Sequence, residues 1–204
     1  MLIESTLPQF LEALQARKPT PGGGSVAALS GALGASLLVM ALRYSVGKNT
    51  TEADRLTLEQ ATARATLLAS ELLDQVDRDA AAYDAVVRAA RDAREDPGDP
   101  ARAERAERAI QHAAEVPLET ALASMQALES IEVLHGKLNK NLSSDALVAT
   151  HCLHAAVLGA VLNVRVNLPS LKRAELRASL AVEADRLSAR ADDIALRLRA
   201  SIAV

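Results

Sequence analysis

Hydrophobic and polar residues recur with a helical period along most of the chain, and the longest such segment runs from Glu52 to Glu95. It contains no Gly or Pro, and apolar residues return every three or four positions along it. These residues are Ala65, Leu68, Leu72, Val76, Tyr83 and Val87. The pattern predicts one very long helix over residues 52–95 with a single face in a core.

Two other segments lack a polar face. No charged residue occurs between Lys18 and Arg43, and the stretch from Ser144 to about Val166 is apolar on nearly every side. Such helices are either buried in a core or span a membrane. The helical part of the first segment barely reaches the ~20 residues that a bilayer requires. We therefore expect two buried central helices and no membrane partner.

Shorter signals complete the fold. Residues 4–17 predict an amphipathic helix that Thr6 caps and that buries Phe10, Leu11 and Leu14. Residues 96–100 form a turn, and a charged helix follows from about residue 101. Pro117 should kink that helix or restart it.

A last charged helix is expected over residues 171–198. We predict a single domain over residues 1–204. Its class is all-α, an up-and-down bundle of about six helices with two buried central helices and one very long helix.

Composition narrows the function classes. Half of the residues are hydrophobic but only 1% are aromatic, which favours closely packed Ala, Leu and Val helices over a β-rich fold. The net charge of -3 gives no electrostatic case for nucleic acid. One cysteine, Cys152, excludes an internal disulfide framework, and the N-terminus has no basic signal-peptide region. We expect a cytoplasmic protein.

Pro19 to Ser25 is the most unusual stretch. Pro21 fixes the backbone, Gly22, Gly23 and Gly24 allow a close approach, and Ser25 is a candidate cap of the next helix. Free N–H groups at that helix start could bind an anion. A tight packing corner between two helices is an equal alternative.

Asp79 falls in the middle of the apolar face of the 52–95 helix. A buried carboxylate is costly unless it is paired or functional, and burial raises its pKa toward values suited to general acid or base work. An arginine partner across the bundle, or an exposed edge position, is the alternative.

A second group of polar residues lies before and along the predicted apolar helix that runs from Ser144 to about Val166. Asp145 lies at its predicted N-terminus after the polar loop that contains Asn141, and Asn163 and Asn167 share one face near its end. Asp145 and Asn163 stand ~27 Å apart along the helix. The two asparagines could clamp a loop or bind a heterocycle.

Histidines raise the question of a metal. His135 ends a single E-x-x-H unit, and His151 and His154 flank Cys152. A di-iron bundle needs two such units with further carboxylates, and a zinc site needs a fourth ligand. We expect no metal site.

Four blocks of this chain resemble the cyclodeaminase/cyclohydrolase family, which comprises the C-terminal domain of formimidoyltransferase-cyclodeaminase and stand-alone methenyltetrahydrofolate cyclohydrolases. In order they are Pro19 to Ala28, Asp79 to Tyr83, Ala114 to Leu118, and Asn141 to Asp145 continuing with Asn163 to Leu168. The resemblance spans nearly the whole chain. It implies an all-helical homodimer that acts on a tetrahydrofolate derivative, with no cofactor beyond the folate substrate.

The resemblance also implies roles for these residues. Asp79 is the first choice for acid/base catalyst, and Asp145 is either the second or an acceptor for pterin N–H groups. Residues 21–25, Lys48, Asn141 and Asn163 would bind substrate. The leading reaction is hydrolysis of 5,10-methenyltetrahydrofolate to 10-formyltetrahydrofolate. The alternatives are a formimidoyltetrahydrofolate cyclodeaminase that releases ammonia, and a non-catalytic folate-binding or dimerisation module.

Overall fold

The structure is a computed structural model that describes residues 1–96 and 98–202. Within these residues it is all helical. The six α-helices are α1 (Leu7–Gln15), α2 (Gly23–Ser45), α3 (Glu52–Glu95), α4 (Pro100–Leu134), α5 (Ser143–Asn167) and α6 (Ala174–Ser201). The short 3-10 turns are η1 (Leu2–Glu4), η2 (His135–Lys137), η3 (Lys140–Leu142) and η4 (Leu168–Ser170).

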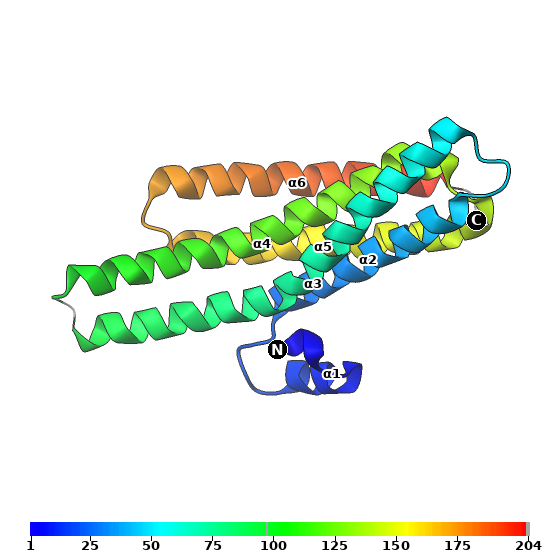
Figure 1. The fold of residues 1–204 in the computed structure, drawn as a ribbon. Coiled ribbons are helices and arrows are strands. Elements are labelled where there is room, and N and C mark those ends of the chain that lie inside the picture. Colours follow the sequence, from blue (N-terminus) through cyan, green and yellow to red (C-terminus); the bar gives the residue numbers. More distant parts are fainter. Residues whose placement is uncertain (97, 203–204) are drawn as a thin grey trace.

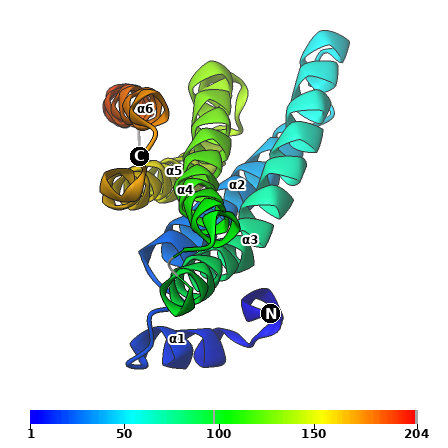
Figure 2. The same cartoon turned by 90° about the vertical axis from the view of Figure 1, so that its left-hand side faces the viewer.

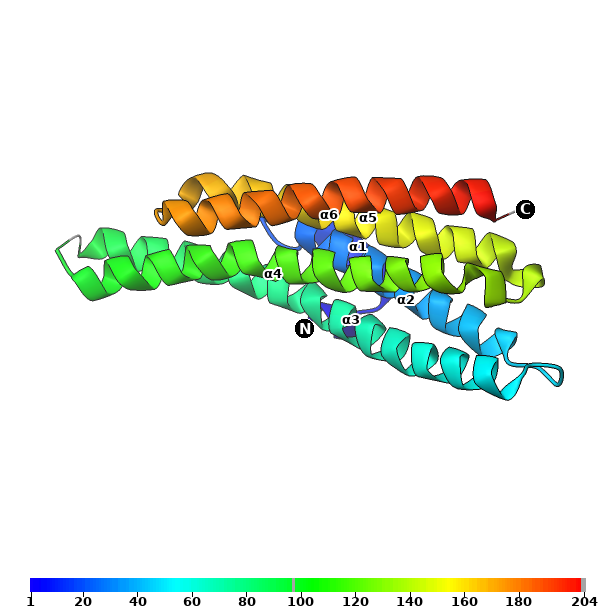
Figure 3. The ribbon, with the colours of Figure 1, turned by 90° about the horizontal axis from the view of Figure 1, so that it is seen from above.

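From α2 onward each helix runs back along the one before it, so the bundle has up-and-down topology (Figure 1). The helix α2 packs against α3, α4 and α5, while α5 packs against α2, α4 and α6. Viewed end-on, α3 and α6 lie at opposite sides of the bundle (Figure 2). The ends of α3 and α4 that meet near residue 98 extend beyond the other helices (Figure 3). The predicted fold class is confirmed.

The central helices α2 and α5 are buried on the faces that meet their neighbours, but each also exposes an apolar row. Leu33 of α2 and Leu162 of α5 are 59% and 62% exposed. Both helices are long and apolar enough to cross a membrane by length and composition, and 61% of the α2 window is buried in the bundle. Packing in a core accounts for that apolar composition equally well.

The helix α3 spans the predicted residues, and Thr51 caps it by accepting a hydrogen bond from the Asp54 backbone N–H. Its apolar face is buried at Leu68, Leu72 and Val76. The same prediction is wrong for Tyr83 and Val87, which are exposed. There α3 packs against α4 through Ala82 and Val86, and this contact leaves Tyr83 and Val87 uncovered.

The N-terminal helix α1 lies outside the bundle. Thr6 caps it in a reciprocal capping box with Gln9, as expected, and Phe10 packs against Ala28 and Val76. Leu11, expected in the core, is exposed because α1 touches the bundle along a narrow face. The predicted turn at 96–100 includes Pro97, which lies outside the described residues; Asp99 caps α4.

Candidate active site

The glycine-rich stretch ends on the first turn of α2. Gly22 is the N-cap residue, and α2 begins at Gly23. Ser25 is therefore the third residue of the helix and not its cap, which corrects the prediction. Its side chain is fully buried and points toward α3.

Asp79 of α3 lies directly against this helix start. The Ser25 hydroxyl is 3.0 Å from the Asp79 Oδ2 atom and 3.0 Å from the backbone carbonyl oxygen of Val76. A Cβ atom added to Gly24 would lie 2.0 Å from Asp79 Oδ1, so only glycine leaves room for the carboxyl group. The stretch therefore packs α2 tightly against α3, and the acidic group beside the helix N-terminus is the Asp79 carboxyl.

Two opposing effects act on the Asp79 carboxyl group. Burial raises its pKa above the ordinary value of 3.8, and the hydroxyl and backbone N–H of Ser25 lower it by a smaller amount. A carboxyl group whose pKa lies above its usual range changes protonation closer to neutral pH, which suits a general acid or base. The partner that the structure gives Asp79 is Ser25, in place of an arginine.

Asp79 opens onto a cleft of about 350 Å³ between the start of α2, the middle of α3 and the end of α5. Its wall consists of Pro19, Thr20, Gly22, Gly23, Gly24, Asp79, Ala82, Tyr83, Val86, Ala113, Asn163, Val166 and Asn167. This volume is at the small end of the range for ligand pockets. Asp79 and Tyr83 are the two titratable side chains among these lining residues.

Asn163 and Asn167 line the cleft from α5, and both side chains donate hydrogen bonds to backbone carbonyl groups. Asn163 Nδ2 donates to the Gly159 carbonyl at 2.8 Å. Asn167 Nδ2 donates to the carbonyl of Ala113 in α4 at 2.8 Å and to that of Asn163 at 3.0 Å. Within the described part of the chain neither Oδ1 atom accepts a protein hydrogen bond, so both remain available as acceptors.

Three candidate residues lie at the opposite end of the bundle. Lys48 is exposed in the loop after α2, Asn141 is exposed in η3, and Asp145 is in the first turn of α5. The 23 residues of α2 separate that end from Gly23, a distance of ~34 Å. A single chain does not bring these three residues to Asp79. Pro21 is buried and, like Ser25, stands behind the cleft wall.

Sequence reasoning missed several residues of the cleft. The helical pattern predicts Tyr83 in the core, yet it is 45% exposed and lines the cleft one helical turn after Asp79. Its spacing of four residues from Asp79 was the available signal. Ala113 and Val166 carried no such signal, because their position depends on how α4 and α5 pack, and the position of Thr20 depends on the loop before α2.

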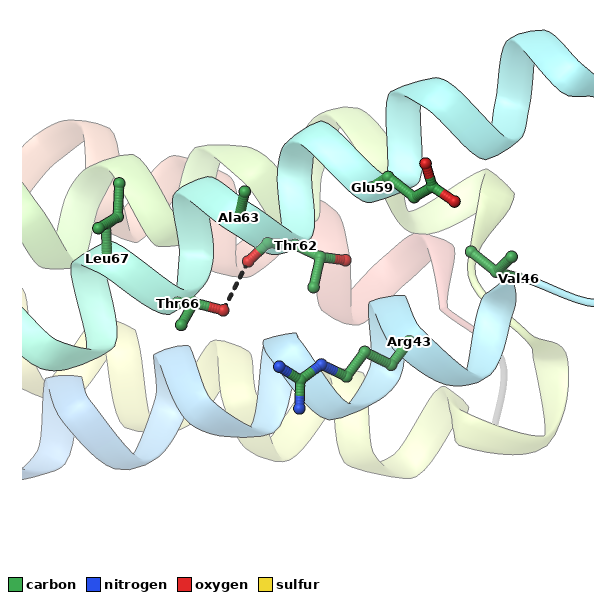
Figure 4. A pocket seen from close by; sticks show the side chains of 7 residues that line it. All are labelled: Arg43, Val46, Glu59, Thr62, Ala63, Thr66 and Leu67. Carbon is green, nitrogen blue, oxygen red and sulfur yellow. Dashed lines mark hydrogen bonds between the residues drawn. The ribbon is translucent and has the colours of Figure 1, made fainter.

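A larger hollow of about 640 Å³ lies between the end of α2 and the start of α3 (Figure 4). Its two threonine hydroxyls are engaged within α3, where Thr62 donates to the Leu58 carbonyl and Thr66 to the Thr62 carbonyl. Arg43 and Glu59 are exposed at its rim. With no buried polar group among its lining residues, this hollow offers less chemistry than the Asp79 cleft.

Metal ligands do not cluster in the described residues: no group of three or more His, Cys, Asp or Glu side chains could hold an ion there. His154 instead contacts Asp192 at 2.7 Å.

Residues 6–186 match the family model described as formiminotransferase-cyclodeaminase. Methenyltetrahydrofolate cyclohydrolase of Methylorubrum extorquens is 32% identical over 167 residues, which cover 81% of this chain and 80% of that protein.

Formimidoyltransferase-cyclodeaminase of Mus musculus is 30% identical over 83% of this chain, and the match spans 32% of the mouse protein's length. Among solved structures, formiminotetrahydrofolate cyclodeaminase of Thermotoga maritima superposes with a TM-score of 0.88 over 99% of this chain and 98% of that one. At 24% identity that likeness concerns the fold. The chain belongs to the formiminotransferase-cyclodeaminase family.

Proposed function

We propose that this chain is a tetrahydrofolate one-carbon enzyme that hydrolyses 5,10-methenyltetrahydrofolate to 10-formyltetrahydrofolate. The observation that carries the proposal is the Asp79 carboxyl group, held against the start of α2 and open to a cleft. Membership of the family and the relative named as a cyclohydrolase support the substrate class.

In the proposed reaction Asp79 first acts as a base. Water adds to the cationic carbon between the folate nitrogens N5 and N10, and one water proton passes to the carboxylate. The tetrahedral intermediate then collapses: its hydroxyl proton leaves to solvent, the carbonyl bond forms and the bond from carbon to N5 breaks. Asp79 returns its proton to N5. The negative charge of Asp79 also stabilises the cationic carbon.

The rest of the cleft suits a flat, polar heterocycle. The free Oδ1 atoms of Asn163 and Asn167 can accept from ring N–H and amino groups, and Tyr83 offers an aromatic face. The first backbone N–H groups of α2, at Gly23 and Gly24, have no acceptor earlier in the helix. They can donate to carbonyl oxygens of the substrate.

A cyclodeaminase reaction is the second candidate, because it uses the same proton transfers. N10 attacks the carbon of the protonated formimino group, the N10 proton passes to Asp79 and then to the leaving nitrogen, and ammonia departs as the methenyl cation forms. The mouse relative supports this reading. Of these two relatives, the protein named as a cyclohydrolase is matched over far more of its length than the mouse protein, which favours hydrolysis.

The test is direct. Purified protein is mixed with 5,10-methenyltetrahydrofolate, and its near-UV absorbance should fall faster than the spontaneous rate. Ammonia release from 5-formiminotetrahydrofolate tests the second candidate. If neither reaction is accelerated while folate still binds, the chain is a non-catalytic binding module and the proposal is wrong.

We also propose a homodimer that forms across α2 and α5. Leu33, Leu162 and Val166 leave apolar rows exposed on two helices that are otherwise central. A symmetric pair of copies would bury the same rows on both chains. If the copies pack antiparallel, the end of one bundle that carries Lys48, Asn141 and Asp145 approaches the Asp79 cleft of the other.

The dimer proposal has its own experiment. Sedimentation should give twice the chain mass, and Leu162→Glu should shift it toward one chain mass. Mixed Asp79→Asn and Asp145→Asn chains should regain about a quarter of native turnover, because half of randomly formed dimers are mixed and each then holds one intact site. No recovery in confirmed mixed dimers would show that each chain has a complete site.

Acid/base chemistry of this kind requires only the folate substrate and, for hydrolysis, water, and we propose that the enzyme uses no further cofactor. We place it in the cytoplasm, in keeping with its single free cysteine. Activity retained after exhaustive dialysis against a chelator would support the first statement, and cell fractionation tests the second.

A further inference from the structure

The Ser25 hydroxyl has one proton to donate and lies beside two acceptor oxygens. Its oxygen lies 3.0 Å from the Val76 carbonyl oxygen and 3.0 Å from Asp79 Oδ2, and the side chain is fully buried. A hydroxyl group donates a single hydrogen bond and can accept others. Both short contacts are therefore satisfied together only if one of the two neighbours donates to Ser25. The Val76 carbonyl cannot donate, but a protonated carboxyl group can.

We propose that Ser25 is a positioning residue whose hydroxyl reverses its hydrogen bond with the protonation of Asp79. When Asp79 is ionised, the hydroxyl donates to Oδ2. When Asp79 is protonated, the carboxyl donates to the Ser25 Oγ atom, and the hydroxyl turns its own proton to the Val76 carbonyl. The carboxyl group is hydrogen-bonded in each state, and only hydrogen atoms have to move.

Among the groups around Asp79, Ser25 is the one placed to change its hydrogen bond when the carboxyl gains or loses a proton. From α2 the cleft receives only glycines, from α4 it receives Ala113, and from α5 it receives Val166 and the two asparagines. The one other titratable group of the lining is Tyr83, on the same helix as Asp79. An unsatisfied buried polar group is costly, so a partner that serves a single state would disfavour the other.

This inference deepens the proposed function and, for its catalytic consequence, rests on it. An acid/base carboxyl group must hold a proton in one step and lack it in the next. A hydroxyl that bonds both forms keeps the carboxyl in one position throughout, which is a form of preorganisation.

Unfolding by urea tests the reversal without substrate or turnover, so its failure is separate from failure of the proposed enzyme reaction. Ser25→Ala should lower the unfolding midpoint similarly at a pH below and a pH above the titration of Asp79. A hydroxyl that bonds only the ionised carboxylate would lower it above that titration alone, which would overturn the proposal. Ser124→Ala is the matched control, because Ser124 is equally buried and its hydroxyl has no partner among the described residues. It should lower the midpoint at neither pH.

Titration of the Asp79 carboxyl carbon by NMR gives a second reading. Loss of a bond to the ionised form alone would raise the pKa of Asp79 by about one to two pH units. Loss of bonds to both forms should move it by less than about one. A large rise would therefore contradict a reversible bond.

Asp79→Asn supplies the third reading, since its amide N–H can donate to Ser25 as a protonated carboxyl would. In that background Ser25→Ala should still lower the unfolding midpoint, and no change would overturn the proposal. If Ser25→Ala does not fold, infrared difference spectra of native protein and Asp79→Asn at low pH replace it. The C=O stretch of the protonated Asp79 carboxyl should lie at the lowered frequency of a hydrogen-bonded acid. A band at the frequency of a free acid would refute the inference.

Discussion

Asn167 supplies the hydrogen-bond donor that Pro117 removes from α4. In a regular helix the Ala113 carbonyl would accept from the N–H of residue 117, which a proline lacks. The Asn167 Nδ2 atom reaches across from α5 and donates to that carbonyl at 2.8 Å. The helix α4 therefore continues through Pro117 and does not restart there. Because Ala113 and Asn167 both line the cleft, this bond also fixes the distance between two of its walls.

This relationship predicts a coupling between the two residues. Asn167→Ala should destabilise the native chain by about 1–3 kcal/mol, because it leaves the Ala113 carbonyl without its donor. In a Pro117→Ala background the backbone N–H returns, and the same change should cost less. Urea unfolding of the four proteins measures the difference as a double-mutant cycle. Additive effects would contradict the assigned bond.

The close packing of Gly24 against Asp79 predicts that a side chain at position 24 displaces the carboxyl group. Gly24→Ala should lower turnover by about 100-fold or more, because the added Cβ atom would lie 2.0 Å from Asp79 Oδ1 and push the carboxyl group aside. Gly23→Ala should lose less, since its Cβ atom would lie 3.3 Å from Asn163 Nδ2, an atom at the end of a side chain. Gly136→Ala meets no atom within 4 Å and should keep native turnover. Equal losses in the first two variants would point to a general effect on the helix start.

Asp79→Asn should remove the proton transfers of the reaction and leave the fold intact. The amide cannot exchange a proton with water or a folate nitrogen, so turnover should fall about 100- to 10,000-fold. Folate binding, measured by calorimetry, should persist because the asparagines and backbone donors remain. Near-native turnover in a folded variant would remove Asp79 as the acid/base group.

The pH dependence of stability should carry a component from Asp79. Because burial raises its pKa in the folded chain, the folded chain holds this proton more tightly than the unfolded chain. The resulting stabilisation is complete below the ordinary pKa of 3.8 and is lost as pH rises through the folded pKa.

Urea unfolding across this pH range measures that component as the free energy of unfolding of the native chain minus that of Asp79→Asn. The difference should fall with rising pH and then level off. Asp54 and Glu183 have lowered pKa values and the opposite sign, but they are present in both proteins and cancel. A difference that rises with pH would mean that the folded chain favours the ionised carboxylate.

Helices could be predicted from sequence because their signals are local. The residues from Glu52 to Glu95 form one helix because no Gly or Pro interrupts them, and Thr6 and Thr51 cap helices through bonds to residues three positions away. These interactions are complete within a few residues of chain. The position of Asp79 on the apolar face of α3 was equally readable, since it follows from the helical period alone.

The sequence by itself thus determined the helices, their order and the presence of a carboxylate where a core was expected. The tertiary structure decided what that carboxylate meets: the start of α2 and the Ser25 hydroxyl. It also exposed Tyr83 in the cleft, gave Pro117 its substitute donor and separated Asp145 from Asp79. Each of these depends on how helices distant in sequence pack, and periodicity fixes which face of a helix is buried without fixing which helix covers it.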